Sequence, residues 1–209
     1  MKFTPATPIL IAEIGVNHEG SSALCYQLID QALTYGFDAV KLQHIVPSEI
    51  WHPNYPLTTL SEKESLTNDL LNKMVSYSKE RGIAIGCTPT FQGSAQVILD
   101  SGCDFIKVAS PQSKYDWFIL DEAIDTNLPL VVSNGHCDHD GSLKLLKYLI
   151  ENTKQQQIAF LYCVSAYPAD SVDMNYDEVS KLSKMCKINS IAFGLSDHNQ
   201  SLYGALKMK

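Results

Sequence analysis

Short apolar runs recur along this chain and alternate with segments of helical periodicity. Seven such runs are present: Ile9–Ile14, Asp38–Gln43, Ile83–Thr88, Phe105–Ala109, Leu130–Ser133, Ile158–Val164 and Ile191–Ser196. Most are apolar throughout rather than at every second position, which is typical of strands that are buried on both faces. The pattern therefore predicts the strands of a parallel sheet.

The segments between these runs predict helices. Ser21–Tyr35 carries apolar residues at positions 24, 28, 29, 32 and 33, and Gly36 follows it as a C-terminal cap. Further helices are expected at Leu66–Glu80, Ser94–Asp100, Tyr115–Thr126, Ser142–Asn152 and Asn175–Cys186. A repeated β-α order indicates an α/β fold with a parallel sheet.

Two architectures share this pattern, the doubly wound open sheet and the closed (β/α) TIM-type barrel. The turn after the first run, Gly15–Gly20, lacks the G-x-G-x-x-G spacing of a dinucleotide-binding sheet. Successive β-α units without a break favour the barrel, which has eight strands when complete. Because about seven are present, we expect a single TIM-barrel domain over residues 1–209 that is truncated at its C-terminus. The longest irregular stretch, Val46–Glu64, is expected to be a functional loop.

Composition narrows the possible partners and the cellular compartment. The chain has 209 residues, 45% of them hydrophobic, and a net charge of -7 with no run of Lys or Arg. This argues against a nucleic acid or an anionic membrane as partner, and no apolar run is long enough to span a membrane. Six cysteines without a C-x-x-C pair favour a reduced, cytoplasmic location. Residues Met1–Pro8 do not have the pattern of a signal peptide.

Charged residues inside the apolar runs are the first candidates for chemistry, since barrel enzymes carry their active sites at the carboxyl ends of the strands. Lys41 and Lys107 lie within otherwise apolar runs, where an unpaired ammonium is costly. The two lysines could converge on one dianion that carries a phosphate and a carboxylate. Alternatively, each could pair with a nearby carboxylate. Glu13 could be the partner of Lys41, a general base, or a ligand of metal-bound water.

Two histidine-containing segments are candidates for metal binding. His198 follows Asp197 at the end of the seventh run and could bind a metal, although it would need partners. The segment His136-Cys137-Asp138-His139-Asp140 crowds ligand-type residues into one loop. Its spacing matches no recognised zinc motif, so a solvated loop is the preferred interpretation.

Five segments together resemble one enzyme family. They are Ile11–Gly20 (IAEIGVNHEG), Asp38–Gln43 (DAVKLQ), Phe105–Ser110 (FIKVAS), Tyr162–Pro168 (YCVSAYP) and Gly194–His198 (GLSDH). They occur in order, span almost the whole chain and resemble the sialic acid synthases, which comprise N-acetylneuraminate synthase and its legionaminate, pseudaminate and spore-coat relatives. The resemblance implies a β/α barrel, commonly followed by a small antifreeze-like domain that we do not expect in these residues.

The resemblance also implies an activity. The family condenses phosphoenolpyruvate with N-acetylmannosamine or a related N-acyl amino sugar and releases phosphate and a nine-carbon 2-keto acid. A divalent metal, Mn²⁺ most often and Mg²⁺ or Co²⁺ as alternatives, binds the sugar aldehyde. A homodimer is the implied assembly. The expectation is therefore an N-acetylneuraminate synthase-type transferase.

The family's functional residues can be carried over by position. Glu13, Lys41, Lys107 and His198 would be catalytic, with His198 as a metal ligand. Phosphoenolpyruvate would be held by Lys41, Lys107, Ser110, Ser133, Ser165 and Ser196. Glu13, Gln43 and Tyr167 would face the sugar or the metal-bound water, and Thr88 and Gln112 are further candidates for substrate binding.

The chain departs from the family at several of these positions. Gln112 follows Pro111 where the family usually has a Glu after Gly, and an amide cannot act as a base. Ser133-Asn134-Gly135-His136 replaces Ser-Thr-Gly-Met, and Tyr162 replaces a His. The second metal histidine of the family, in the motif of strand eight, is lacking. Two alternatives therefore stay open: a catalytically impaired sugar-binding or partner-completed module, and a different barrel lyase or aldolase that uses Lys41 or Lys107 as a Schiff-base amine.

Overall fold

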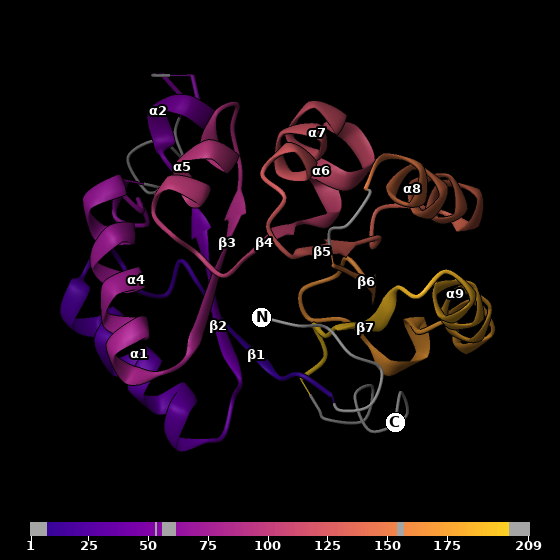
Figure 1. The fold of residues 1–209 in the computed structure, drawn as a ribbon, viewed down its shortest axis with the longest axis horizontal. Coiled ribbons are helices and arrows are strands. Elements are labelled where there is room, and N and C mark those ends of the chain that lie inside the picture. Colours follow the sequence, from indigo (N-terminus) through magenta and orange to yellow (C-terminus); the bar gives the residue numbers. More distant parts are fainter. Residues whose placement is uncertain (1–7, 53, 56–61, 154–156, 201–209) are drawn as a thin grey trace. The chain divides into compact units, whose positions relative to one another are not determined.

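Each of the seven predicted apolar runs forms a strand, with boundaries shifted by at most two residues (Figure 1). The computed structural model describes residues 8–52, 54–55, 62–153 and 157–200. These separate into two units, one that extends to Lys107 and one that begins at Val108. The expectation of one domain over residues 1–209 stays a prediction, and each unit is described by itself.

The first unit contains four parallel strands in the order in which they occur along the chain. They are β1 (Ile11–Gly15), β2 (Ala39–His44), β3 (Ala84–Pro89) and β4 (Phe105–Val108). The register pairs Lys41 with Glu13 on one side and with Gly86 on the other, and it pairs Gly86 with Phe105. Because side chains alternate between the two faces of a strand, this register fixes which residues share a face. Glu13, Lys41, Gln43, Thr88 and Lys107 all lie on the same face.

Helices cover the sheet of the first unit, and their ends follow local sequence signals. They are α1 (Ser22–Thr34), α2 (Pro47–Ile50), α4 (Asn68–Arg81) and α5 (Ser94–Asp100). Ser21 and Thr67 cap α1 and α4 by accepting backbone N–H groups, and α4 ends at Gly82, whose φ of 74° is left-handed. Helices α1, α4 and α5 pack against β1 to β3 (Figure 1), so the core of this unit lies between helices and sheet.

A close approach between strands fixes one glycine in that core. A methyl group on Gly86 would lie 2.3 Å from the ring of Phe105. Phe105 is fully buried beside it, so only glycine leaves room for the ring.

The second unit contains three parallel strands, again in chain order. They are β5 (Leu130–Ser133), β6 (Ile158–Cys163) and β7 (Ala192–Ser196). The register pairs Ser133 with Leu161 and Cys163 with Ser196. The alternation of side chains therefore places Ser133, Cys163 and Ser196 on one face and Tyr162 on the other. The helices are α6 (Ser110–Tyr115), α7 (Trp117–Asp125), α8 (His139–Asn152) and α9 (Tyr176–Ile188), with a short 3₁₀ helix at Ser171–Asp173.

The predicted helices are present with shifted ends, and one further helix was missed. The helix expected at Tyr115–Thr126 is α7, which begins two residues later than predicted because the Asp116 side chain caps it by accepting the Ile119 N–H. Helix α6 was missed: it begins at Ser110, where Pro111 is compatible with a first turn. Helix α8 begins at His139 rather than Ser142, since the Asp138 side chain accepts the Gly141 N–H. Within the expected irregular loop 46–64, the short helix α2 is present.

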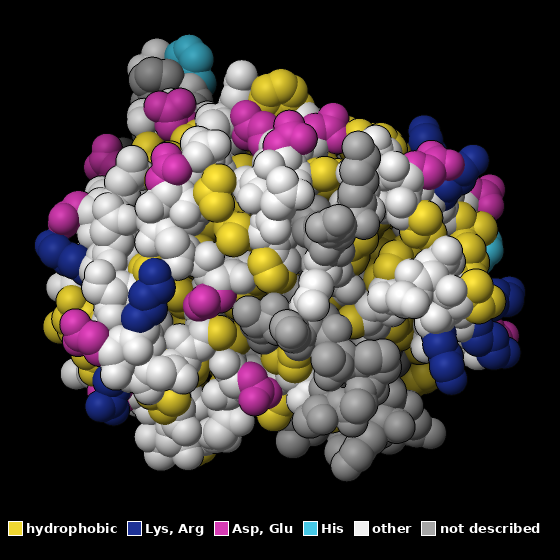
Figure 2. Space-filling model, viewed as in Figure 1, with side chains coloured by type: hydrophobic (Ala, Val, Ile, Leu, Met, Phe, Trp, Pro, Cys, Tyr) yellow, Lys and Arg dark blue, Asp and Glu magenta, His cyan; other side chains and the backbone are white. Residues whose placement is uncertain are grey.

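The surface mixes charges of both signs. On the face shown in Figure 2, Lys and Arg lie singly or in small groups near Asp and Glu. Among the described residues, no helix combines the length and apolar character that crossing a bilayer requires. The parallel strands in chain order, joined by helices, confirm the predicted α/β fold class.

Candidate active site

A buried ammonium group lies within the sheet of the first unit. Lys41 is only 3% exposed. Its Nζ lies 2.8 Å from Glu13 Oε2, 2.8 Å from Thr88 Oγ1 and 3.4 Å from the carbonyl oxygen of Leu42. These three contacts match the three donors of an ammonium group. The pairing of Lys41 with a carboxylate, one of the two interpretations drawn from the sequence, is therefore confirmed.

The carboxylate of Glu13 reaches from this pair toward solvent. Its side chain is 52% exposed, compared with 4% for that of Lys41. A methyl group on Gly15 would lie 3.3 Å from Glu13 Oε1 and 3.9 Å from Gln43 Nε2. The ends of the Glu13 and Gln43 side chains therefore both lie next to Gly15. One carboxylate oxygen thus holds the buried cation while the other is available for a second role.

The second predicted lysine lies on the same face of this sheet. Lys107 is half-buried in β4, two residues after Phe105, and Thr88 is 2% exposed. We call Glu13, Lys41, Gln43, Thr88 and Lys107 the cationic cluster. Two ammonium groups on one face, one of them buried, suit a ligand with two negative charges.

A buried histidine that the sequence analysis missed supports the loops around this cluster. His44 is fully buried at the end of β2, with Nδ1 2.8 Å from Ser94 Oγ and Nε2 3.1 Å from Asn68 Oδ1. Burial lowers the pKa of His44, and the hydrogen bond to Asn68 acts in the opposite direction. Since Asn68 begins α4 and Ser94 begins α5, His44 joins three segments near the cluster. No local motif in the sequence marks this role.

Hydroxyl groups of the second unit converge on Gly135, in the loop after β5. The Gly135 N–H donates to Ser110 Oγ at 3.0 Å. A methyl group on Gly135 would lie 2.5 Å from Ser165 Oγ, 2.7 Å from Cys163 Sγ and 2.9 Å from Ser110 Oγ. Ser165 Oγ also lies 3.0 Å from His136 Nδ1. The structure therefore brings the predicted Ser110 and Ser165 together around a glycine; we call Ser110, Gly135, His136, Cys163 and Ser165 the hydroxyl cluster.

Two further predicted residues in this unit have polar atoms without an internal partner. Ser133 Oγ and Gln112 Oε1 are buried and form no hydrogen bond within the described part of the chain. Ser133 is fully buried, and its backbone carbonyl accepts a hydrogen bond from Ser113 Oγ at 2.6 Å. Buried polar atoms normally have partners, so these unsatisfied atoms, at the end of β5 and in the first turn of α6, are candidates for ligand contact.

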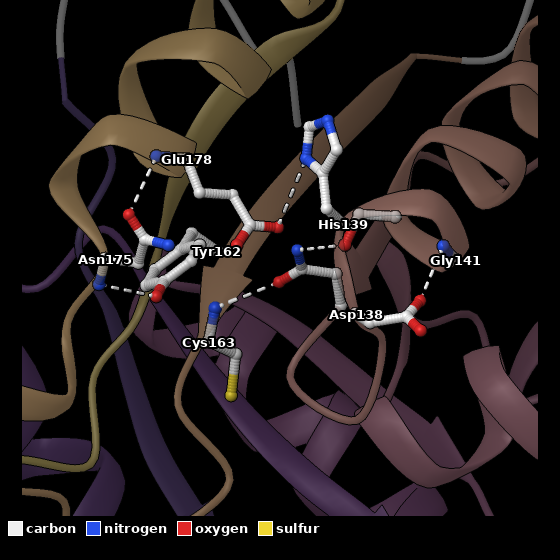
Figure 3. Close-up of polar contacts among 9 residues, drawn as sticks. Asp138, His139, Gly141, Tyr162, Cys163, Asn175 and Glu178 are labelled. Carbon is white, nitrogen blue, oxygen red and sulfur yellow. Dashed lines mark hydrogen bonds and ion pairs between the residues drawn. The ribbon is translucent and has the colours of Figure 1, made fainter.

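The loop that carries Gly135 is held by buried hydrogen bonds. Asn134, 2% exposed, accepts the Cys163 N–H at 3.1 Å and donates to Ser142 Oγ at 2.9 Å. Figure 3 shows how Asp138 caps α8 through the Gly141 N–H, at 2.8 Å. His139 turns toward Glu178, with 3.9 Å between Nδ1 and Oε1 (Figure 3). Residues 136–138 thus form a loop, as the preferred sequence interpretation predicted, whereas His139 and Asp140 begin α8.

His198 contacts the neighbouring β6 loop. Its Nδ1 lies 2.8 Å from the carbonyl oxygen of Val164, and the Tyr167 ring stacks on the imidazole at 4.0 Å between centroids and 29° between planes. A proton on Nδ1 that is donated to this carbonyl makes Nε2 the basic nitrogen, as in many histidines that bind metals. His198 is thus suited to be one of the ligands of a metal ion. However, no three His, Cys, Asp or Glu side chains gather as a metal-binding group within the residues that the structure describes.

The remaining predicted residues are spread along the ends of the second unit's strands. Ser196 is half-buried at the end of β7, beside Cys163 in the register. Tyr162, which replaces the family His, faces the other side and accepts the Asn175 N–H at 3.0 Å (Figure 3). Burial raises the pKa of the Tyr162 hydroxyl. Tyr162 therefore supports the start of α9 rather than the face that carries Cys163 and Ser196.

A separate cavity of about 260 Å³ lies on helices α1 and α4 of the first unit. It is lined by Tyr26, Asp69, Asn72, Lys73, Ser76, Tyr77 and Glu80. None of these residues belongs to the strand ends, so this cavity is distinct from the candidate site.

Comparisons with known proteins show what the chain is similar to. The chain is 27% identical to N,N'-diacetyllegionaminic acid synthase from Campylobacter jejuni and 28% identical to pseudaminic acid synthase from Helicobacter pylori. The matches cover 95% and 91% of this chain but only 63% and 59% of those proteins. The chain therefore spans about three fifths of the length of these curated relatives.

The fold has a close structural counterpart. The crystal structure of N-acetylneuraminic acid (sialic acid) synthetase from Leptospira borgpetersenii, in complex with citrate, matches with a TM-score of 0.85 and 23% identity. The match covers 97% of this chain and 69% of that one, which confirms the predicted TIM-type fold. The sequence model described as "NeuB family" matches residues 28–207. Since that match extends over most of the sequence, the chain belongs to the NeuB family.

Proposed function

We propose that this chain takes part in the condensation of phosphoenolpyruvate with an N-acyl amino sugar, such as N-acetylmannosamine, to give a nine-carbon 2-keto sugar acid and phosphate. The observation that carries the proposal is the buried ammonium of Lys41, which lies inside β2 on the face shared with Lys107. Burying a cation in a protein costs several kcal/mol, even after the surrounding protein and water relax. The half-exposed Glu13 offsets part of this cost, and in the proposal an anionic ligand on the same face, held by Lys107 as well, offsets the rest.

The cationic cluster would bind and polarise the donor. In the proposal, Lys41 and Lys107 neutralise the phosphate and carboxylate of phosphoenolpyruvate, and Thr88 keeps the Lys41 ammonium in place. Glu13 would hold Lys41 through one oxygen and position the attacking water through the other, while Gln43 contacts the sugar. The half-exposed Glu13 side chain supports this double role, since it is accessible to a ligand from solvent while it pairs with Lys41.

The second unit would supply neutral donors and one metal ligand. Ser110, Ser133, Ser165 and Ser196 would donate hydrogen bonds to the oxygens of the donor, and Tyr167 and Gln112 would contact the sugar. His198 would be one ligand of a divalent ion, preferably Mn²⁺, with its other ligands from outside the described residues. When bound, such an ion polarises the sugar aldehyde as a Lewis acid. A homodimer stays a prediction.

Phosphate release tests the proposal. The full chain is incubated with phosphoenolpyruvate, Mn²⁺ and either N-acetylmannosamine or the sugar precursors of legionaminic and pseudaminic acid. We expect phosphate release that depends on the sugar, and a decrease of roughly 100-fold or more in Lys41→Met and Lys107→Met, since electrostatic partners of a reacting group contribute on this scale. Lys73→Met is the matched control, because Lys73 pairs only on the helix surface with Asp69. No sugar-dependent release with any of these sugars would refute catalysis.

Gln112 supports a second candidate function, a sugar-binding module with impaired catalysis. Its neutral amide stands where the family has a carboxylate, and an amide cannot take up a proton as a base. Under this alternative, the wild-type chain binds phosphoenolpyruvate without releasing phosphate. The Gln112→Glu variant would then gain sugar-dependent release, and a gain would favour the alternative over the synthase.

A further inference from the structure

His136 occupies a position in the hydroxyl cluster that its sequence context did not predict. Its Nδ1 lies 3.0 Å from Ser165 Oγ, although its side chain is exposed to solvent. The ring of Tyr115 meets the imidazole edge-on, with 5.9 Å between centroids and an interplanar angle of 76°. His136 is thus oriented by two contacts from two different segments, the end of α6 and the loop after β6.

The backbone around His136 is fixed by the fold. The Asn134 N–H donates to the Leu161 carbonyl at 3.1 Å, and the Cys137 N–H donates to the Asn134 carbonyl at 2.7 Å. The buried Asn134 side chain adds its bonds to Cys163 and Ser142. His136 therefore has a position set by strands β5 and β6, as residues that orient a binding group require.

The contact with His136 decides what the Ser165 hydroxyl can do. A serine has one proton to donate. If an unprotonated Nδ1 accepts that proton, the hydroxyl has none left for a ligand. If Nδ1 carries a proton and donates it to Ser165 Oγ, the serine proton is directed elsewhere. An anion beside Ser165 favours this second arrangement, because it is stabilised by hydrogen-bond donors and by positive charge.

We propose that His136 is a positioning residue: it donates to Ser165 and thereby turns the Ser165 hydroxyl toward an oxyanion of the anionic donor, a phosphate or a carboxylate. This inference rests on the proposed function for the identity of that donor. Ser110, which accepts the Gly135 N–H and lies with Ser165 on the side of Gly135 where a Cβ would project, would bind the same oxyanion. A Met at this position would have no side-chain N–H to donate, which makes it the informative substitution.

Binding rather than turnover tests the inference. Titration calorimetry with the full chain would use two probes, phosphoenolpyruvate and inorganic phosphate. We expect His136→Met to weaken binding of at least one probe about tenfold, the scale of one hydrogen bond to a charged group. His136→Asn should recover most of the affinity, because an Asn amide nitrogen can take the place of Nδ1. His139→Met is the matched control: it lies in the same segment but turns toward Glu178, and it should bind as the wild type does.

A double-mutant cycle shows whether His136 acts through Ser165. In a Ser165→Ala background, His136→Met should change affinity less than twofold, because the hydroxyl that it orients is gone. An undiminished effect in that background would mean that His136 acts independently, and it would overturn the inference. Wild-type affinity in His136→Met, or failure of the wild type to bind either probe at millimolar concentration, would also overturn it. Phosphate binding that depends on His136, without sugar-dependent phosphate release, would leave the inference standing and remove only the proposed condensation.

Discussion

The ion pair between Glu13 and Lys41 leads to a testable prediction about the free energy of unfolding. Glu13→Gln keeps the shape of the side chain but removes the charge that compensates the buried ammonium. Removing one partner of a buried ion pair costs about 3–5 kcal/mol when both groups are desolvated. Here Lys41 is buried, but the Glu13 side chain is 52% exposed, and exposed charges are screened by water. We therefore expect a loss of roughly 2 kcal/mol, about half of the buried value.

The second substitution should reverse that loss. Lys41→Met, introduced into the Glu13→Gln protein, removes the uncompensated ammonium and places an apolar side chain among the apolar residues of β2. The remaining cost is that the Thr88 hydroxyl loses its hydrogen bond with Lys41, which is worth about 1 kcal/mol. The double variant should thus be more stable than Glu13→Gln alone, within about 1 kcal/mol of the wild type, although it should no longer bind phosphoenolpyruvate.

Urea denaturation followed by circular dichroism measures these differences, and thermal unfolding supports them. For a chain of this size, 1 kcal/mol corresponds to about 2–4 °C in Tm, so Glu13→Gln should unfold roughly 4–8 °C below the wild type. Asp69→Asn, which breaks the exposed helical pair with Lys73, is the control and should cost about 0.5 kcal/mol or less. If the double variant is less stable than Glu13→Gln, the ammonium is not what the carboxylate compensates, and the reasoning is refuted.

Two further predictions concern Gly135 and the cysteines. Gly135→Ala should destabilise the protein by about 1–3 kcal/mol, because the added methyl group would lie 2.5 Å from Ser165 Oγ and 2.7 Å from Cys163 Sγ and must displace both. The same variant should bind phosphoenolpyruvate more weakly in calorimetry. An unchanged affinity would contradict the role of the hydroxyl cluster. Burial raises the thiol pKa of Cys25, Cys103 and Cys186 to about 12 and that of Cys87 well above its usual value. Only the thiolate reacts with Ellman's reagent, and a pH of about 8 is far below these raised pKa values. The reagent should therefore label the half-buried Cys137 first, and all six cysteines only after the protein unfolds. If mass spectrometry finds Cys87 labelled as fast as Cys137, Cys87 is not buried.

Local sequence signals accounted for much of the secondary structure. Apolar runs long enough for a buried strand could be recognised without tertiary contacts, and the caps Ser21 and Thr67 act within one turn of their helices. The helix predicted from Tyr115 begins two residues later, at Trp117, because the Asp116 side chain caps it. Helix α6 was missed because it is six residues long, too short for periodicity to show.

The candidate site was predictable in its members but only partly in its contacts. The sequence showed that Lys41 and Lys107 interrupt apolar runs and that serines end several strands. It named Glu13 as one possible partner of Lys41, but it had no signal for Thr88 as the other, since Thr88 is 47 residues away. Nor did it connect His136 with Ser165, which is 29 residues away.

The sequence by itself determined that this protein has alternating strands and helices, that lysines interrupt two of the strands and that hydroxyls end several of them, because burial and helix capping depend on neighbouring residues. Only the tertiary structure decided which of these groups meet. Contacts between strands depend on register, and a shift of one residue would turn every side chain of a strand to the opposite face. That is why Lys41 meets Glu13 and Thr88, why Tyr162 faces away from Cys163 and Ser196, and why Gly135 is surrounded by side chains from two other segments.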